Sequence, residues 1–249
     1  MTALGAALYY DYSLANATPP AETLLDALLE NEAGLTQFCV PIAPRAEAPK
    51  PLRRDSLFAR VKRGELASFL VGTPAQTPDV DAITVGFVLV PPTAAAQEGR
   101  AGYRYRLDVA FGAAALARRG ASSVVDALVA FADTVAPRAG VVFPADSAAF
   151  AHAYASGARG GLTEEQDRRV KDVFYAVYEL GDRIRGPEWG TFLDRHHVEK
   201  LGGRSRIEQE AGCAIMRPLA DGGLYLQLTE SFDVPYALDA LTTFLAPVR

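Results

Sequence analysis

The sequence predicts an α+β fold, in which an antiparallel sheet carries helices packed on one face. Two β-type segments, residues 83–90 and 103–111, follow each other before a helical segment, and residues 214–219 and 224–229 do the same near the C-terminus. Asp221-Gly222-Gly223 between the last two segments is typical of a hairpin turn. The chain lacks the regular alternation of one strand with one helix that indicates a parallel sheet.

The first third of the chain divides into short elements by hydrophobic period and by proline and glycine. Helical spacing of leucines predicts a helix that ends near Gly34, and a Pro-rich stretch predicts a surface loop. The expected elements are a strand at 3–12, a helix at 21–34, a short strand at 37–42, a loop at 43–54, a helix around Leu57 and Val61, and strands at 66–71 and 83–90.

Residues 103–111 alternate between apolar and charged side chains. Tyr105, Leu107 and Val109 share one face, whereas Arg106 and Asp108 share the other. This period of two predicts a half-buried strand with one side in water.

Three pairs of residues have the spacing of a helix capping box, in which a hydroxyl residue precedes an acidic or amide residue by three positions. The pairs are Ser123 with Asp126, Thr163 with Gln166, and Ser205 with Glu208. They predict helix starts at 123, 163 and 205, the first helix ending at Pro137 and the second at Gly181. A strand at 141–143, a short helix within 145–156 and a final helix at 235–245 complete the expected elements.

The chain is expected to form a single domain, residues 1–249, because this length suits one large core. Residues 126–138 (DALVAFADTVAPR) echo residues 239–249 (DALTTFLAPVR), and each follows a pair of strands. The echo is compatible with two similar strand–strand–helix halves, about 1–143 and 144–249, although a shared Ala and Leu bias in helices explains it equally well.

Composition disfavours several classes of protein. No segment approaches the roughly 18 apolar residues that a membrane span needs, and the N-terminus lacks the basic start of a secretory signal, so a cytoplasmic location is expected. The formal net charge of −5 disfavours nucleic acid as a partner and suits a basic protein partner.

The segment GPEWGTFLDRHHVEKLGG, residues 186–203, contains the single tryptophan and two of the three histidines. His196 and His197 are adjacent, so on a helix they point about 100° apart and cannot both face one metal ion. Thr191 is expected to cap a helix that Gly202 closes, with Trp189 filling a gap in the core.

Other catalytic patterns are missing from the sequence. There is no Gly-x-Ser-x-Gly elbow and no phosphate-binding loop with its Lys-Ser/Thr. Cys39 and Cys213 lie in apolar segments and are expected to be buried, unreactive thiols. The sequence therefore predicts no catalytic residue, no cofactor site and no metal site, and it does not identify partner-binding residues.

The pattern Gly-x-x-Trp-x-Thr-x-Leu from Gly186 to Leu193, the Leu-Gly-Gly at 201–203, the hairpin and the terminal APVR resemble the C-terminal half of a family of bacterial immunity proteins. This family belongs to type VI secretion and polymorphic-toxin loci. Where the family pattern often has Asn before the tryptophan, this chain has Glu188. The resemblance covers about the last 65 residues.

The resemblance implies a non-enzymatic inhibitor that neutralises its cognate toxin by stoichiometric binding, with a basic nuclease-type toxin as a suitable partner for an acidic inhibitor. The acidic faces at Glu22–Glu32 and Glu164–Asp167 are ordinary solvated surface unless the toxin contacts them. Two alternatives stay open: an enzyme in which His152 joins His196 or His197 at a non-local site, and a structural or adaptor component of a secretion system.

Overall fold

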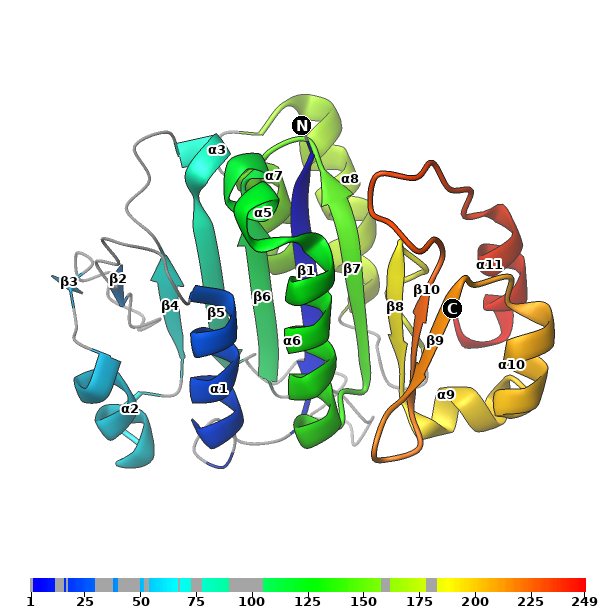
Figure 1. Cartoon of the computed structure of the whole chain (residues 1–249), viewed down its shortest axis with the longest axis horizontal. Coiled ribbons are helices and arrows are strands. Elements are labelled where there is room, and N and C mark those ends of the chain that lie inside the picture. The colour runs from blue at the N-terminus through cyan, green and yellow to red at the C-terminus, as the bar shows by residue number, and fades with distance from the viewer. Residues whose placement is uncertain are drawn as a thin grey trace.

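The computed structural model describes residues 2–11, 16, 18–29, 38–39, 50–51, 54–66, 68–72, 78–89, 105–157, 162–177 and 183–249. Their main feature is an 8-stranded antiparallel sheet in the order β4-β5-β6-β1-β7-β8-β10-β9, with helices on both faces (Figure 1). The predicted α+β class and the antiparallel sheet are confirmed. Within the described residues, no helix is both long and apolar enough to cross a bilayer.

The strands of the large sheet lie at intervals through the whole chain. They are β1 Ala3–Tyr10, β4 Phe69–Gly72, β5 Ile83–Leu89, β6 Tyr105–Phe111, β7 Ala139–Ala145, β8 Gly190–Leu193, β9 Ile215–Pro218 and β10 Leu224–Gln227. A separate pair joins β2 Phe38–Cys39 to β3 Lys50–Pro51. Strand β2 confirms the expected strand at 37–42 for residues 38–39 alone, whereas β3 and the first residue of α2 lie within the loop expected at 43–54; the rest of both segments lies outside the described residues.

Helices occupy most of the connections between strands. They are α1 Thr18–Leu29, α2 Arg54–Lys62, α3 Pro78–Asp81, α5 Ala113–Arg119, α6 Ala121–Val135, α7 Ala148–Ser156, α8 Glu164–Val177, α9 Arg195–Lys200, α10 Arg204–Glu210, α11 Asp239–Phe244 and the 3-10 turn Ala246–Val248. The final helix is shorter than the expected 235–245, and the stops expected at Gly34 and Gly181 lie outside the described residues.

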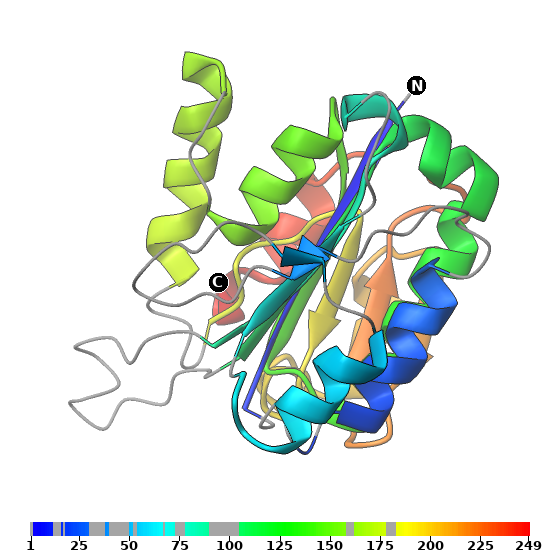
Figure 2. The same ribbon diagram turned by 90° about the vertical axis from the view of Figure 1, so that its left-hand side faces the viewer.

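The N-terminal strand β1 lies in the middle of the sheet, where it pairs with β6 on one side and β7 on the other. All eight of its residues are buried, because helices cover both faces. Figure 2 shows the sheet edge-on, with α1 and α6 on one side and α7 and α8 on the other. The helices therefore do not lie on one face only, as the sequence had indicated.

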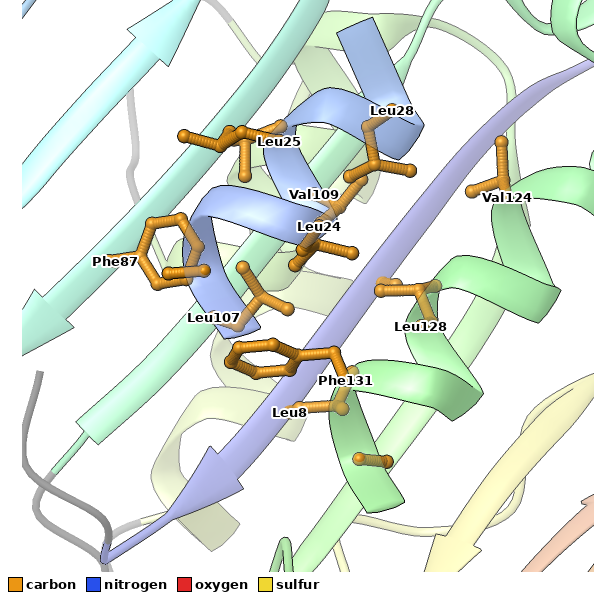
Figure 3. Packing of buried hydrophobic residues seen from close by; sticks show 14 of the residues in the cluster. Leu8, Leu24, Leu25, Leu28, Phe87, Leu107, Val109, Val124, Leu128 and Phe131 are labelled. Carbon is orange, nitrogen blue, oxygen red and sulfur yellow. The ribbon is translucent and has the colours of Figure 1, made fainter. Parts of the chain in front are cut away.

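The face beneath α1 and α6 holds the larger apolar core. Leucines of α1 and the stripe of α6 that includes Leu128 and Phe131 lie over Leu8, Leu107 and Phe87 of the strands (Figure 3). Each helix presents residues three and four positions apart to the sheet, as an amphipathic helix does. Burial of these side chains supplies most of the favourable free energy of folding.

The opposite face of β6 is covered by α7, so the predicted wet side of this strand is wrong. Arg106 and Asp108 are almost fully buried there, and Nε of Arg106 lies 2.6 Å from Oδ1 of Asp108. Opposite charges side by side on one strand neutralise each other, which allows a charged face to be buried.

Of the three predicted capping boxes, only the one at Thr163 is confirmed. The N–H of Thr163 donates to Oε1 of Gln166 (3.0 Å), and the N–H of Gln166 donates to Oγ1 of Thr163 (3.3 Å). The other two are wrong, because α6 and α10 begin after Gly120 and Gly203 without a side-chain cap. The acidic residues of these two pairs form ion pairs with arginines instead: Asp126 with Arg217, and Glu208 with Arg204.

The segment after Trp189 is a strand and not the expected helix. Gly190–Leu193 form β8, which pairs with β7 and β10, and Thr191 is buried within it. The helix α9 begins only after Asp194, whose Oδ1 accepts a hydrogen bond from the N–H of His197 (2.8 Å). Gly202, at φ 95°, adopts the left-handed conformation expected at the end of this helix.

The two segments that echo each other in sequence lie in different surroundings. Residues 126–138 include most of the long helix α6, whose apolar side chains belong to the larger core. Leu241 and Leu245 belong to the apolar cluster on the opposite face of the sheet. The likeness of these segments is therefore one of amphipathic pattern, and their packing differs.

Candidate binding cleft

A solvent-facing hollow of about 640 Å³ lies at the end of the sheet where β1 finishes and β7 begins. Its walls come from the end of α6, at the bottom centre of Figure 1, and from α9 and the β9–β10 turn to its right. We call this hollow the cleft. Its lining residues are Asp11, Val135, Ala136, Arg138, Asp194, Arg195, His196, Glu199 and Asp221.

Local structure fixes each wall of the cleft. Ala136 ends α6 in a left-handed conformation (φ 49°), and Pro137 follows, so the chain turns sharply into β7. The β9–β10 turn is closed by Asp221, whose Oδ1 accepts a hydrogen bond from the N–H of Gly223 (3.0 Å), with Gly222 at φ 92°. The N–H of Ala220 donates to Oδ1 of Asp133 (3.0 Å), which ties this turn to α6.

Ion pairs cross the floor and one wall of the cleft. Nε of Arg138 lies 2.9 Å from Oδ2 of Asp11, and Nη1 lies 3.9 Å from Oδ2 of Asp194. On α9, Nε of Arg195 lies 2.7 Å from Oε1 of Glu199. The last pair is largely exposed, so it contributes little to stability and is available to a partner.

Asp194 is the least exposed carboxylate of the cleft. Burial acts to raise the pKa of Asp194, but the hydrogen bonds from His197 and the charge of Arg138 outweigh burial and lower this pKa. Nδ1 of His197 lies 2.8 Å from Oδ1 of Asp194. Asp194 therefore stays ionised at pH values below the ordinary pKa of an aspartate. It caps the N-terminus of α9 and pairs with Arg138, which precedes β7, so it links this helix to that strand.

The three histidines do not converge on one site. His196 lines the cleft, and His197 points into the core beside Asp194. His152 lies on α7 near Arg106 and Asp108, and burial lowers its pKa. Among the described residues, no group of three or more His, Cys, Asp or Glu side chains is placed to hold a metal ion.

Trp189 is buried (2% exposed), as predicted, and organises the loop after β10. Its Nε1 donates a hydrogen bond to Oγ1 of Thr229 (2.8 Å), and its ring meets that of Phe232 edge to face, with centroids 4.9 Å apart. The loop lies at the opposite end of the strands from the β9–β10 turn (Figure 1) and exposes Val234. The tryptophan is thus architectural, but its loop is accessible.

Glu188, the residue that departs from the family pattern, belongs to a buried polar cluster. Burial raises the pKa of Glu188, although the hydroxyl of Tyr154, which donates to Oε1 of Glu188 (2.7 Å), and the charge of Arg185 act to lower it. Nη1 of Arg185 donates to the hydroxyl of Tyr9 (3.1 Å), and its guanidinium lies 4.3 Å from the ring centroid of Tyr154. These contacts tie the segment before β8 to α7 and β1.

The acidic helix faces and the thiols behave as ordinary surface and core groups where the structure describes them. Oε1 of Glu22 lies 3.4 Å from Nζ of Lys62, and Oδ2 of Asp167 lies 2.7 Å from Nζ of Lys171. Cys213 is only partly buried and not fully buried as expected, but burial still raises the pKa of its thiol to about 11. The side chain of Cys39 lies outside the described part.

Sequence reasoning missed the cleft itself. Asp11, Arg138 and Asp221 lie more than eighty residues apart in the chain, and the sequence places them in a strand, just after a helix and in a hairpin turn. Their only signal in the sequence is that each of these polar residues lies at the end of an apolar strand or next to one. In an antiparallel sheet, the ends of several strands meet at the same edge.

Comparison with known proteins shows a likeness in structure alone. No family model matches the chain, and no curated protein matches it. The solved structure of the Pseudomonas aeruginosa T6SS protein PA0821 is similar over 100% of this chain and 77% of that chain, with a TM-score of 0.60 and 14% sequence identity. At this identity the likeness establishes a shared fold with a protein named for type VI secretion.

Proposed function

We propose that this chain is an immunity protein that binds a cognate secreted bacterial toxin and neutralises it by stoichiometric inhibition. The observation that carries the proposal is the likeness in fold to a T6SS protein along the whole of this chain. The immunity-type block from Gly186 to Gly203 supports it from the sequence.

The chemistry of the described surface is compatible with a binding role. The cleft is concave and charged, and its β9–β10 turn is tied to α6 by the hydrogen bond from Ala220 to Asp133, so it can dock a partner without large ordering costs. Inhibition by occlusion needs shape, anchors and complementary charge, and no catalytic group.

The two alternatives predict different features. An enzyme with a shared histidine site requires His152 near His196 or His197, yet His152 faces the Arg106–Asp108 pair while His196 lines the cleft. A self-associating adaptor favours a broad exposed apolar patch; in the described residues the exposed large apolar side chains are Leu89 and Val234, on separate elements.

The direct test is co-expression with the toxin encoded beside the gene for this chain. We expect the chain to restore growth and to form a 1:1 complex with that toxin after purification. Co-expressed chain that neither rescues growth nor binds would refute the immunity proposal. Turnover of a small substrate by the purified chain, abolished by His196→Ala, would favour the enzyme.

A further inference from the structure

The cleft carries an unequal distribution of charge. Four carboxylates line it, and two arginines face them; with histidine counted as neutral, the lining has a formal charge of −2. Each arginine is already engaged within the cleft, Arg138 by Asp11 and Asp194, and Arg195 by Glu199. The charge that remains is therefore negative, because Asp221 has no arginine partner in the part of the chain that the structure describes and Arg138 is shared by two carboxylates, Asp11 and Asp194.

Asp221 is the carboxylate with no cation of its own. Its Oδ1 accepts the N–H of Gly223, and no basic side chain of the described residues lies within 4.0 Å of it. The turn holds this carboxylate in one direction at the rim. Arg195, whose stem lies over Gly222, is turned toward Glu199 on its own helix.

The end of α6 adds to the negative potential. Val135 and Ala136 line the cleft, so the C-terminal turn of this 15-residue helix borders the hollow. A helix C-terminus stabilises a nearby cation and destabilises a nearby anion. The end of α6 therefore favours a cation over an anion in the cleft.

We infer that the cleft receives a basic side chain of the partner toxin, a lysine or an arginine carried on a protruding loop, and that Asp221 and Glu199 are the carboxylates that dock it. The inference rests on the proposed function and adds the surface and the chemistry of its partner. A volume of about 640 Å³ is in the range of protein binding sites, and is wider than one side chain, so part of the loop enters too.

The geometry favours docking without rearrangement of the free chain. Asp133 fixes the β9–β10 turn to α6, and Arg217 of β9 binds Asp126 in the same helix. A cation that enters between Asp221 and Glu199 competes with Arg195 for Glu199 alone, and that exposed pair is weak.

The experiment measures binding of the toxin encoded by the neighbouring gene to the wild-type chain, Asp221→Asn, Glu199→Gln and the control Glu208→Gln. Asparagine at 221 keeps an oxygen that can accept the N–H of Gly223. Glu208 forms the same i,i+4 pair with arginine (2.8 Å) as Glu199 does (2.7 Å), on the adjacent helix α10 and outside the cleft. Melting temperatures establish that all variants fold.

We expect each cleft variant to raise the dissociation constant about tenfold, partly through a slower association rate, and the control to change it by less than about twofold. The effect is expected to shrink in 0.5 M salt, where exposed charges are screened. Cleft variants that bind as tightly as the control would overturn the inference and leave the immunity proposal standing.

Val234→Asp tests the other end of the strands. If this variant abolishes binding while the cleft variants do not, docking runs through the loop after β10 and the cleft inference is wrong. If Val234→Asp binds normally and the cleft variants do not, the inference is supported. A wild-type chain that does not bind the toxin at all refutes the proposed function itself, which is a separate result from the loss seen only in cleft variants.

Discussion

Replacing Trp189 with alanine should destabilise the fold strongly. The indole is 2% exposed, donates a hydrogen bond to Thr229 and meets the ring of Phe232. Removing a buried aromatic ring leaves a cavity that the surroundings fill only in part, which lowers the free energy of unfolding by about 3 to 5 kcal/mol. The lost hydrogen bond, about 1 kcal/mol, is included in that range.

The two contributions can be separated by a second variant. Thr229→Val keeps the ring and removes the acceptor of its N–H, so we expect a loss of only about 1 to 2 kcal/mol. Val234→Ala, on the same loop but at an exposed position, is the surface control and should stay within about 0.5 kcal/mol.

Urea unfolding, followed by far-UV circular dichroism so that the signal does not depend on the tryptophan, measures these free energies of unfolding. In thermal unfolding, the melting temperature of Trp189→Ala should be about 6 to 20 °C lower than that of the wild type for a chain of this length. A loss below about 1 kcal/mol for Trp189→Ala would refute the assignment of this ring to the core. Weaker toxin binding at an unchanged melting temperature would place the ring at the interface instead.

Three further variants test the core and the thiol. Gly5→Ala should destabilise the chain by about 1 to 3 kcal/mol, since a Cβ there would lie 2.3 Å from the ring of Phe143; an unchanged thermal midpoint would show that the ring yields freely. Asp108→Ala removes the carboxylate 2.6 Å from a buried guanidinium and should lower the urea-unfolding free energy by about 3 to 5 kcal/mol; a change under 1 kcal/mol would contradict its burial. Burial raises the pKa of Cys213 to about 11, so its thiolate is scarce below that pH, and in a Cys39→Ser variant alkylation by iodoacetamide at pH 8 should be about tenfold slower than that of a cysteine peptide; equal rates would contradict the raised pKa.

Local sequence patterns predicted the helices whose apolar residues repeat over several turns, and the hairpin whose turn sequence is distinctive. The leucines of α1, the stripe of α6 and the Asp221-Gly222-Gly223 turn each specify their structure from neighbours in sequence. Thr163 and Gln166 also cap α8 as expected, because α8 begins at Glu164, directly after Thr163.

Tertiary contacts decided the features that local patterns did not. Gly190–Leu193 is too short to have a period, and pairing with β7 and β10 makes it a strand. The charges of Arg106 and Asp108 predicted a solvent-exposed face of β6, but the two side chains form an ion pair that is buried beneath α7. The cleft depends on strand order, which places Asp11 and Arg138 on adjacent chain ends, and no local signal gives that order.

The central position of β1 constrains how a ribosome can deliver this protein. The strand leaves the exit tunnel well before either of its neighbours, because Leu4 pairs with Phe111 and Ala3 with Ala145. At about 5 to 20 residues per second, an apolar strand waits on the order of ten seconds for its second neighbour. Nascent chains should therefore depend on holding chaperones during synthesis, because the sheet around β1 can close only after β7 has been made.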